Sequence, residues 1–171
     1  MLRIGQWISE TGQVPRIDRF SFTAQGSPYL DIHWLFQLAL YRAWGLLGHT
    51  AAALVTFGGA LGTVALLAPI GFRRGRSALS VALLALFLLA SGYRFLPRPE
   101  MASFVFLAAE LTLFHRFRQR RDLWIFVVVA IQFVWVNVHG LFAVGIAVCG
   151  AYLAAEVLRH GFVHLLHMQD Q

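Results

Sequence analysis

The sequence predicts an all-α protein: a polytopic bundle of about five transmembrane helices, with one further helix at the outer membrane surface. Hydrophobic residues make up 58% of the 171 residues, and the mean hydropathy is +0.66. Charged residues are only 13% of the chain, about half the share usual in soluble domains. Long uncharged runs lie between Thr50 and Arg159, and roughly 20 apolar residues suffice for one helical span.

The composition also narrows the classes of partner. All 14 basic residues are arginine, which we interpret as an effect of genome composition, so the net charge of +6 does not indicate a nucleic-acid partner. Membrane lipids are the partners that the composition predicts. The single cysteine, Cys149, excludes a disulfide framework.

The first 49 residues divide into a polar part and a helical part. The segment from Asp31 to Leu47 has a helical pattern and carries Trp34, Tyr41 and Trp44, which suit the headgroup zone. If this segment crossed the membrane, the orientation of the later basic clusters would reverse, so we expect an interfacial helix. The predicted organisation is an outer loop (1–30), an interfacial helix (31–48), a transmembrane bundle (50–159) and a cytoplasmic tail (160–171).

Five apolar segments follow in order, separated by charged or proline-containing turns. Pro97 and Pro99 end the second segment, because proline removes a backbone donor and restricts the preceding residue. The expected spans are Thr50–Phe72, Ser77–Tyr93, Met101–Phe114, Leu123–Val138 and Gly140–Ala155.

The arginine clusters set the expected orientation. Basic residues beside apolar spans mark the cytoplasmic side, and they occur at 73–76 and 116–121. With both clusters inside, the segments 15–31, 94–98 and 137–139 all lie outside, and the C-terminus is cytoplasmic. The unusual polar stretches are therefore expected on one membrane face.

Asp18 is the first candidate functional residue, since it lies between Arg16 and Arg19 in the outer loop. A carboxylate there could act as a general base toward an acceptor hydroxyl, or could help to hold a divalent cation. The alternative is an Asx-type turn in which Asp18 has a local structural role.

The interfacial helix opens with two more candidates. Asp31 is placed to cap that helix or to offset its dipole, and His33 is a candidate substrate or metal contact. His33, Gln37 and Tyr41 recur at intervals of four and predict a polar stripe.

The remaining outer candidates lie in the turns between spans. Arg94 and Arg98 flank a proline turn, and paired guanidinium donors match the phosphate oxygens of a lipid-linked substrate or, equally, those of ordinary lipid headgroups. Asn137 and His139 end the fourth span, where unpaired polar groups are costly, so we expect them to hydrogen-bond to another outer segment or to contact a substrate.

Two features lie within the spans. Glu110 is an acidic residue inside the third span, where carboxylates are functional candidates, although a side chain so near Arg116 could also reach the inner interface. Gly58 and Gly62 form a G-x-x-x-G pattern that predicts close helix packing.

Three strings taken together, "GQWISETGQVPRIDRFSFTAQGSPYLDIHWLFQLAL", "RFLPRPE" and "WVNVHGLF", resemble a bacterial family of multi-spanning proteins related to GT-C glycosyltransferases. The likeness runs from Gly5 to the last span. It implies a bacterial plasma-membrane enzyme that transfers a sugar from a polyprenyl-phosphate carrier on the outer face. In such enzymes an outer aspartate is the base or metal contact and basic residues hold the phosphate, roles that Asp18, Arg94 and Arg98 could fill.

The sequence departs from that family at two places. His33 stands where a glutamate is expected before "WL". Relatives also carry a first span and an acidic, Trp- and His-containing segment before the G-x-W-I string, so we expect such a span upstream of Met1. The alternative function is a truncated, non-catalytic subunit that packs against other membrane subunits.

Overall fold

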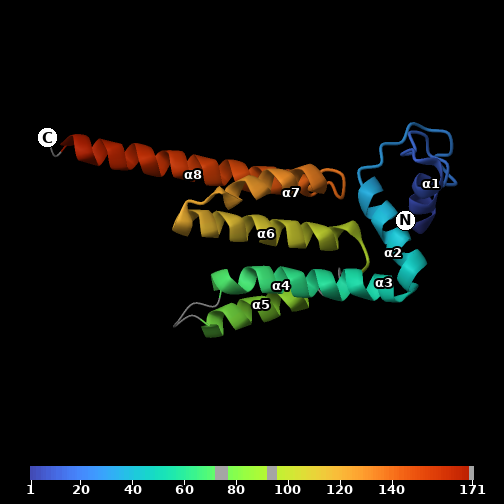
Figure 1. Ribbon diagram of the computed structural model, residues 1–171, viewed down its shortest axis with the longest axis horizontal. Coiled ribbons are helices and arrows are strands. Elements are labelled where there is room, and N and C mark those ends of the chain that lie inside the picture. The colour runs from blue at the N-terminus through green and yellow to red at the C-terminus, as the bar shows by residue number, and fades with distance from the viewer. Residues whose placement is uncertain (72–76, 92–95, 170–171) are drawn as a thin grey trace.

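The computed structural model describes residues 1–71, 77–91 and 96–169, and these parts of the chain are helical apart from their connecting segments. Figure 1 shows the arrangement. The helices are α1 (Leu2–Thr11), α2 (Trp34–Leu47), α3 (Thr50–Ala53), α4 (Gly59–Gly71), α5 (Ser77–Ser91), α6 (Pro99–Arg120), α7 (Val127–Trp135) and α8 (Phe142–Gln169). A π-helical turn, η1 (Leu54–Gly58), joins α3 to α4, and a 3-10 turn, η3 (Leu123–Phe126), precedes α7.

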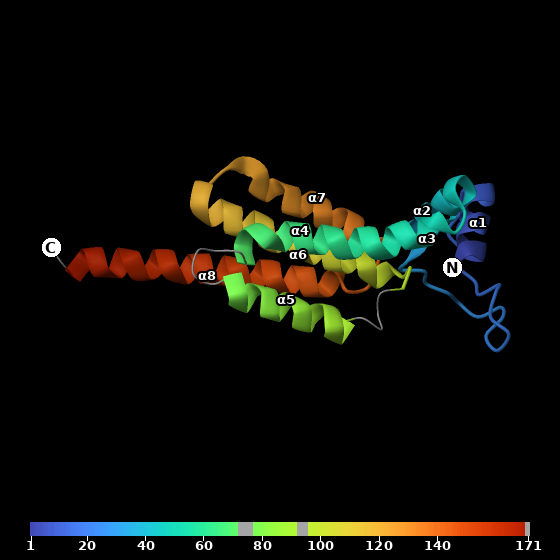
Figure 2. The same cartoon turned by 90° about the horizontal axis from the view of Figure 1, so that it is seen from below.

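The all-α class is confirmed, and the larger helices run side by side (Figures 1 and 2). Within the described residues, two segments are long and apolar enough to cross a membrane: Thr50–Gly71, with mean hydropathy 1.9, and Phe142–Gly161, with 1.6. Their most apolar stretches are only 11% and 6% buried within the chain. These helices therefore present apolar surface outward and are not a buried core.

Helices α4 and α6 pack closely through small residues. A β carbon at Gly59 would lie 3.3 Å from the Met101 side chain, and one at Gly62 would lie 3.8 Å from Val105. The G-x-x-x-G pattern predicted that Gly58 and Gly62 form the close contact. This was wrong for Gly58, which faces open space. The close face of α4 is set by a spacing of three residues.

The expected loop 1–30 begins with a helix. Residues Leu2–Thr11 form α1 because Ile4 and Ile8 fall four residues apart, on one face, and Ile8 is buried. Gly5 is the closest approach to α2, since a β carbon there would overlap the backbone oxygen of Gln37. Helix α1 thus uses α2 as its packing surface.

Helix α2 is attached to one end of the bundle. Phe36 and Leu40 are buried against Val138 in one apolar cluster, and the Leu35 amide donates to the Asn137 carbonyl at 3.2 Å. Figure 1 shows α1, α2 and the connecting loop together at this end, while the C-terminal end of α6 and the end of α8 lie at the other. The packing places the N-terminal loop beside the α7–α8 turn.

Candidate functional site

The loop between α1 and α2 has a defined internal structure. Its two arms meet at Ile17 and Pro28, which form an isolated antiparallel pairing. The Asp18 amide donates to the Ser27 carbonyl at 2.9 Å, and the Tyr29 amide donates to the Arg16 carbonyl at 2.8 Å. These bonds place the residues around position 16 beside those around position 29, close to the start of α2.

Asp18 occupies a tight turn at the outer part of this loop. Its Oδ1 accepts the backbone N–H groups of Phe20 (3.0 Å) and Ser21 (2.9 Å), and its Oδ2 accepts the Ser21 hydroxyl at 2.7 Å. The Ser21 hydroxyl, followed by the two amides, lowers the pKa of the Asp18 carboxyl. This is the Asx-type turn that the sequence left open as the alternative, and it keeps the carboxylate ionised.

Asp31 lies deeper than a helix cap requires. The side chain is buried, and its Oδ1 accepts the His33 amide at 3.0 Å and the Gln37 Nε2 at 3.1 Å. Among the described residues, neither its Oδ2 nor the Oε1 of Gln37, both buried, has a hydrogen-bond partner. The predicted polar stripe therefore turns inward at Gln37, which is needed to satisfy Asp31.

Asn137 hydrogen-bonds to the start of α2, which is the structural one of the two roles that the sequence left open for it. Its Oδ1 accepts the Trp34 indole N–H at 3.0 Å, and its Nδ2 donates to the Phe133 carbonyl at 2.9 Å. These bonds, together with the Leu35 amide, fix the start of α2 against the α7–α8 turn.

His139 bonds to α6 rather than to an outer loop. The Trp135 indole donates to the Ser103 hydroxyl at 2.8 Å, and that hydroxyl lies 3.0 Å from Nδ1 of His139. The Ser103 hydroxyl has one proton and two lone pairs, so the tautomer of the neutral imidazole determines whether it donates to Nδ1 or accepts from it. Burial lowers the pKa of His139 and agrees with this neutral state. The ring of His33 lies 5.2 Å from that of His139, between centroids.

A cavity of about 310 Å³ brings several of these residues together. Arg16, Asp31 and Asn137 line it, together with Tyr29 and Trp34. Burial, and secondarily the Asp31 carboxylate, raises the pKa of Tyr29, so its hydroxyl keeps its proton at neutral pH. The wall thus offers a cation, a carboxylate, an amide and a phenol.

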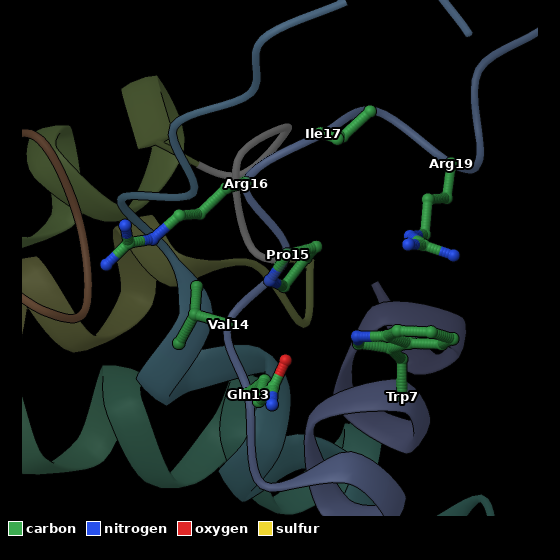
Figure 3. Close-up of a pocket in the computed structure, with 7 residues that line it drawn as sticks. All are labelled: Trp7, Gln13, Val14, Pro15, Arg16, Ile17 and Arg19. Atoms are coloured by element: carbon green, nitrogen blue, oxygen red, sulfur yellow. The ribbon is translucent and has the colours of Figure 1, made fainter. Parts of the chain in front are cut away.

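A second hollow of about 550 Å³ shares Val14, Pro15 and Arg16 with the wall of the first. Figure 3 shows that the Arg19 guanidinium lies over the Trp7 indole, whereas Arg16 extends away from them. The distance from the Arg19 Cζ to the centre of the Trp7 ring is 4.7 Å, within the range of a cation–π contact. Arg16 also lines this hollow and so separates the two.

Of the two predicted phosphate contacts, Arg98 is not among the residues that line these walls. Arg98 precedes the first residue of α6 and its side chain is exposed at the same end of the bundle. Arg94 lies outside the described residues. Within the described ranges, no group of three or more His, Cys, Asp or Glu side chains is placed to hold a metal ion.

Glu110 does not extend to the interface. It is fully buried between helices, its Oε1 accepts the Gln132 Nε2 at 2.6 Å, and its Oε2 has no hydrogen-bond partner. At the far end of α6, Arg116 pairs with Asp122 at 2.7 Å and Arg121 with Glu156 at 3.0 Å.

Sequence reasoning did not select Arg16, Tyr29 or Gln37 as site residues. The one available signal was the position of Arg16 beside Asp18, in the loop already singled out, whereas Gln37 resembled any polar residue of a surface helix.

Comparison with protein-family models, with curated proteins and with solved structures finds no match to this chain.

Proposed function

We propose that this chain is a multi-pass protein of the bacterial plasma membrane and forms part of a GT-C-type glycosyltransferase. The five helical segments after residue 50 span the bilayer, the α1–α2 end faces outward and the C-terminus is cytoplasmic. The protein handles a sugar carried on a polyprenyl phosphate at the outward end.

The observation that supports the proposal is the cavity lined by Arg16, Asp31 and Asn137 at one end of the bundle. These residues are far apart in the sequence and come from the loop, the start of α2 and the α7–α8 turn. Convergent polar groups in a concave site beside apolar helices are what recognition of a polar headgroup on a lipid tail requires. Arg16 supplies paired donors for phosphate oxygens, while Asp31 and Asn137 offer hydrogen-bonding partners to sugar hydroxyls.

Two carboxylates could serve the chemistry. In transfer, the acceptor hydroxyl attacks the anomeric carbon, the bond from the sugar to phosphate breaks, and a base takes the hydroxyl proton. Asp18 is ionised, but its oxygens already accept three hydrogen bonds, which weakens it as a base. Asp31 lines the cavity and retains one unpartnered oxygen. Arg98, His33 and His139 lie around this end as further substrate contacts, and Arg94 belongs to the same proposed set.

The test is sugar transfer from polyprenyl-phosphate-linked donors by the purified protein in lipid. We expect Asp31→Asn or Asp18→Asn to reduce the rate about 100-fold or more, the range typical of a lost acid–base group. The matched control for Asp18 is Ser21→Ala, because this change removes a hydrogen bond of the turn and leaves the carboxylate. Equal transfer by both aspartate variants and the wild type would contradict the proposed roles.

A second candidate is a non-catalytic membrane subunit, and the engagement of Asp18 within its own turn favours it. In that case the wild type transfers no sugar and the purified chain retains another membrane subunit in mild detergent. Neither aspartate variant would then change the outcome.

A further inference from the structure

The tip of the α1–α2 loop, residues 18–26, exposes apolar side chains on the surface of the chain. Phe22 is 100% exposed and Phe20 is 42% exposed. Exposing a whole phenylalanine side chain to water is unfavourable relative to burying it. These side chains therefore indicate a surface that is covered in the working protein.

The loop is built to hold this tip in place. The Asp18 carboxylate stabilises the turn by accepting the amides of Phe20 and Ser21. The Gly26 amide donates to the Asp18 carbonyl at 2.8 Å. Gly26 has φ +85°, a left-handed conformation that glycine adopts at no steric cost. The exposed phenylalanines thus lie on an ordered turn.

Two arginines accompany the apolar tip. Arg16 and Arg19 are exposed, and no ion pair to either is found within the described ranges. Arg19 rests one face on Trp7, and its N–H groups, which lie in the guanidinium plane, remain free to bind phosphate. The only acid of the tip, Asp18, has its oxygens occupied by the turn.

The loop lies at the α2 end of the bundle and extends to its side (Figure 2). We propose that this loop is a membrane-surface anchor: Phe20 and Phe22 enter the boundary between headgroups and acyl chains, and Arg16 and Arg19 bind the phosphates of anionic phospholipids. Apolar side chains flanked by arginines are the pattern of segments that lie in the interface, and each basic residue adds attraction to an anionic surface. The inference rests on the proposed embedding of the bundle but not on sugar transfer.

The experiment places one fluorescent label, an environment-sensitive nitrobenzoxadiazole group, on the full chain in single-protein nanodiscs. Cys149→Ser removes the native thiol, and Phe22→Cys provides the label site. Because the Phe22 side chain is fully exposed, we expect its replacement to leave the fold intact. Quenching by a headgroup-quencher lipid is compared with quenching by aqueous iodide, in phosphatidylcholine and in phosphatidylcholine with phosphatidylglycerol.

We expect the label at Phe22 to be quenched severalfold more by the lipid than by iodide when phosphatidylglycerol is present. The preference falls in phosphatidylcholine alone and in Arg16→Gln/Arg19→Gln, while Arg16→Lys/Arg19→Lys retains it. Leu153→Cys, on the exposed apolar face of α8, is the control for embedding, and Thr11→Cys at the end of α1 is the control for the loop.

Iodide quenching at Phe22 with lipid quenching at Leu153 overturns the anchor and leaves the embedding intact. Iodide quenching at both sites overturns both. Equal lipid quenching at Thr11 and Phe22 overturns the assignment to the loop tip, and a phosphatidylglycerol dependence that survives Arg16→Gln/Arg19→Gln overturns the role of the arginines. Protection of Phe22 from both quenchers assigns the surface to a protein contact and overturns the lipid anchor.

Discussion

At the scale of single residues, the site depends on polar groups that are buried with some of their hydrogen-bonding capacity unused. Asp31 and Gln37 each retain one buried oxygen without a partner near the loop, and Glu110 and Gln132 do so inside the bundle. Leaving such an acceptor unsatisfied costs about 1–3 kcal/mol. Asp31 also lines a cavity, so a ligand can reach its vicinity, which is the physical basis for placing the site there rather than at Glu110.

His139 gives a prediction of pH dependence. Its pKa is lowered by burial; the nearby Glu100 carboxylate opposes this shift, and His33 adds to it. Between the lowered pKa and the ordinary value of about 6.5, the unfolded chain binds more protons than the folded one, so stability falls as pH falls. We expect the thermal midpoint of the detergent-solubilised protein to decrease below about pH 6.5.

The matched variant for this prediction is His139→Gln, which keeps an acceptor for Ser103 but does not titrate in this range. Its thermal midpoint is expected to depend less on pH over the same window. An identical pH dependence in both proteins would show that another group is responsible.

At the scale of elements, the contact between α1 and α2 depends on one glycine. A β carbon at Gly5 would overlap the Gln37 carbonyl oxygen and lie 2.7 Å from Cβ of Tyr41. We expect Gly5→Ala to separate the helices and to reduce the free energy of unfolding by about 1–3 kcal/mol, as overpacking does. Gly45→Ala is the control, since Gly45 lies in α2 with nothing within 4 Å; it should be neutral or stabilising by up to about 1 kcal/mol. Chemical denaturation in detergent distinguishes the two.

The helical segments were predictable because their signal is composition over a long window. Each predicted segment after residue 50 falls on a helix of the structure. The uncharged apolar runs that predict a segment also form the helix, and the prolines that end the run also end the helix. Helix α1 was missed because ten residues with mixed polarity acquire their packing surface only from α2. The inward orientation of Gln37 was missed for the same reason. Which side of α2 is buried depends on its contacts with α1 and Asp31, and the residue pattern of α2 alone does not reveal these contacts.

For the candidate site, the sequence indicated Asp31 and Asn137 but not their geometry. Both line the cavity, whereas Asp18 lies in its own turn and Arg98 lies outside the wall. Arg16 was overlooked because a guanidinium beside an aspartate suggests an ion pair, and here the loop turns the two apart. Tertiary pairing of the loop arms, absent from any local pattern, decides which charged residue reaches the cavity.

At the scale of the whole molecule, the proposal depends on the distribution of charge along the bundle axis. The loop and the α7–α8 turn lie at one end, and the C-terminal end of α6 lies at the other (Figure 1), where Arg116 and the following Arg121 form ion pairs. Basic clusters mark the cytoplasmic side, so the cavity should open outward. We expect cysteines placed at the two ends to differ in their reaction with a membrane-impermeant maleimide.

The pair of sites is Gln25→Cys in the loop and Gln119→Cys near the end of α6, each in the Cys149→Ser background; both native side chains are exposed. In intact expressing cells the maleimide should label position 25 and not position 119, and in inverted membrane vesicles the preference should reverse. Labelling of both sites in sealed cells would mean that the chain does not separate the two compartments. Labelling of position 119 alone would place the cavity on the cytoplasmic side, where a sugar transfer on the outer face could not use it.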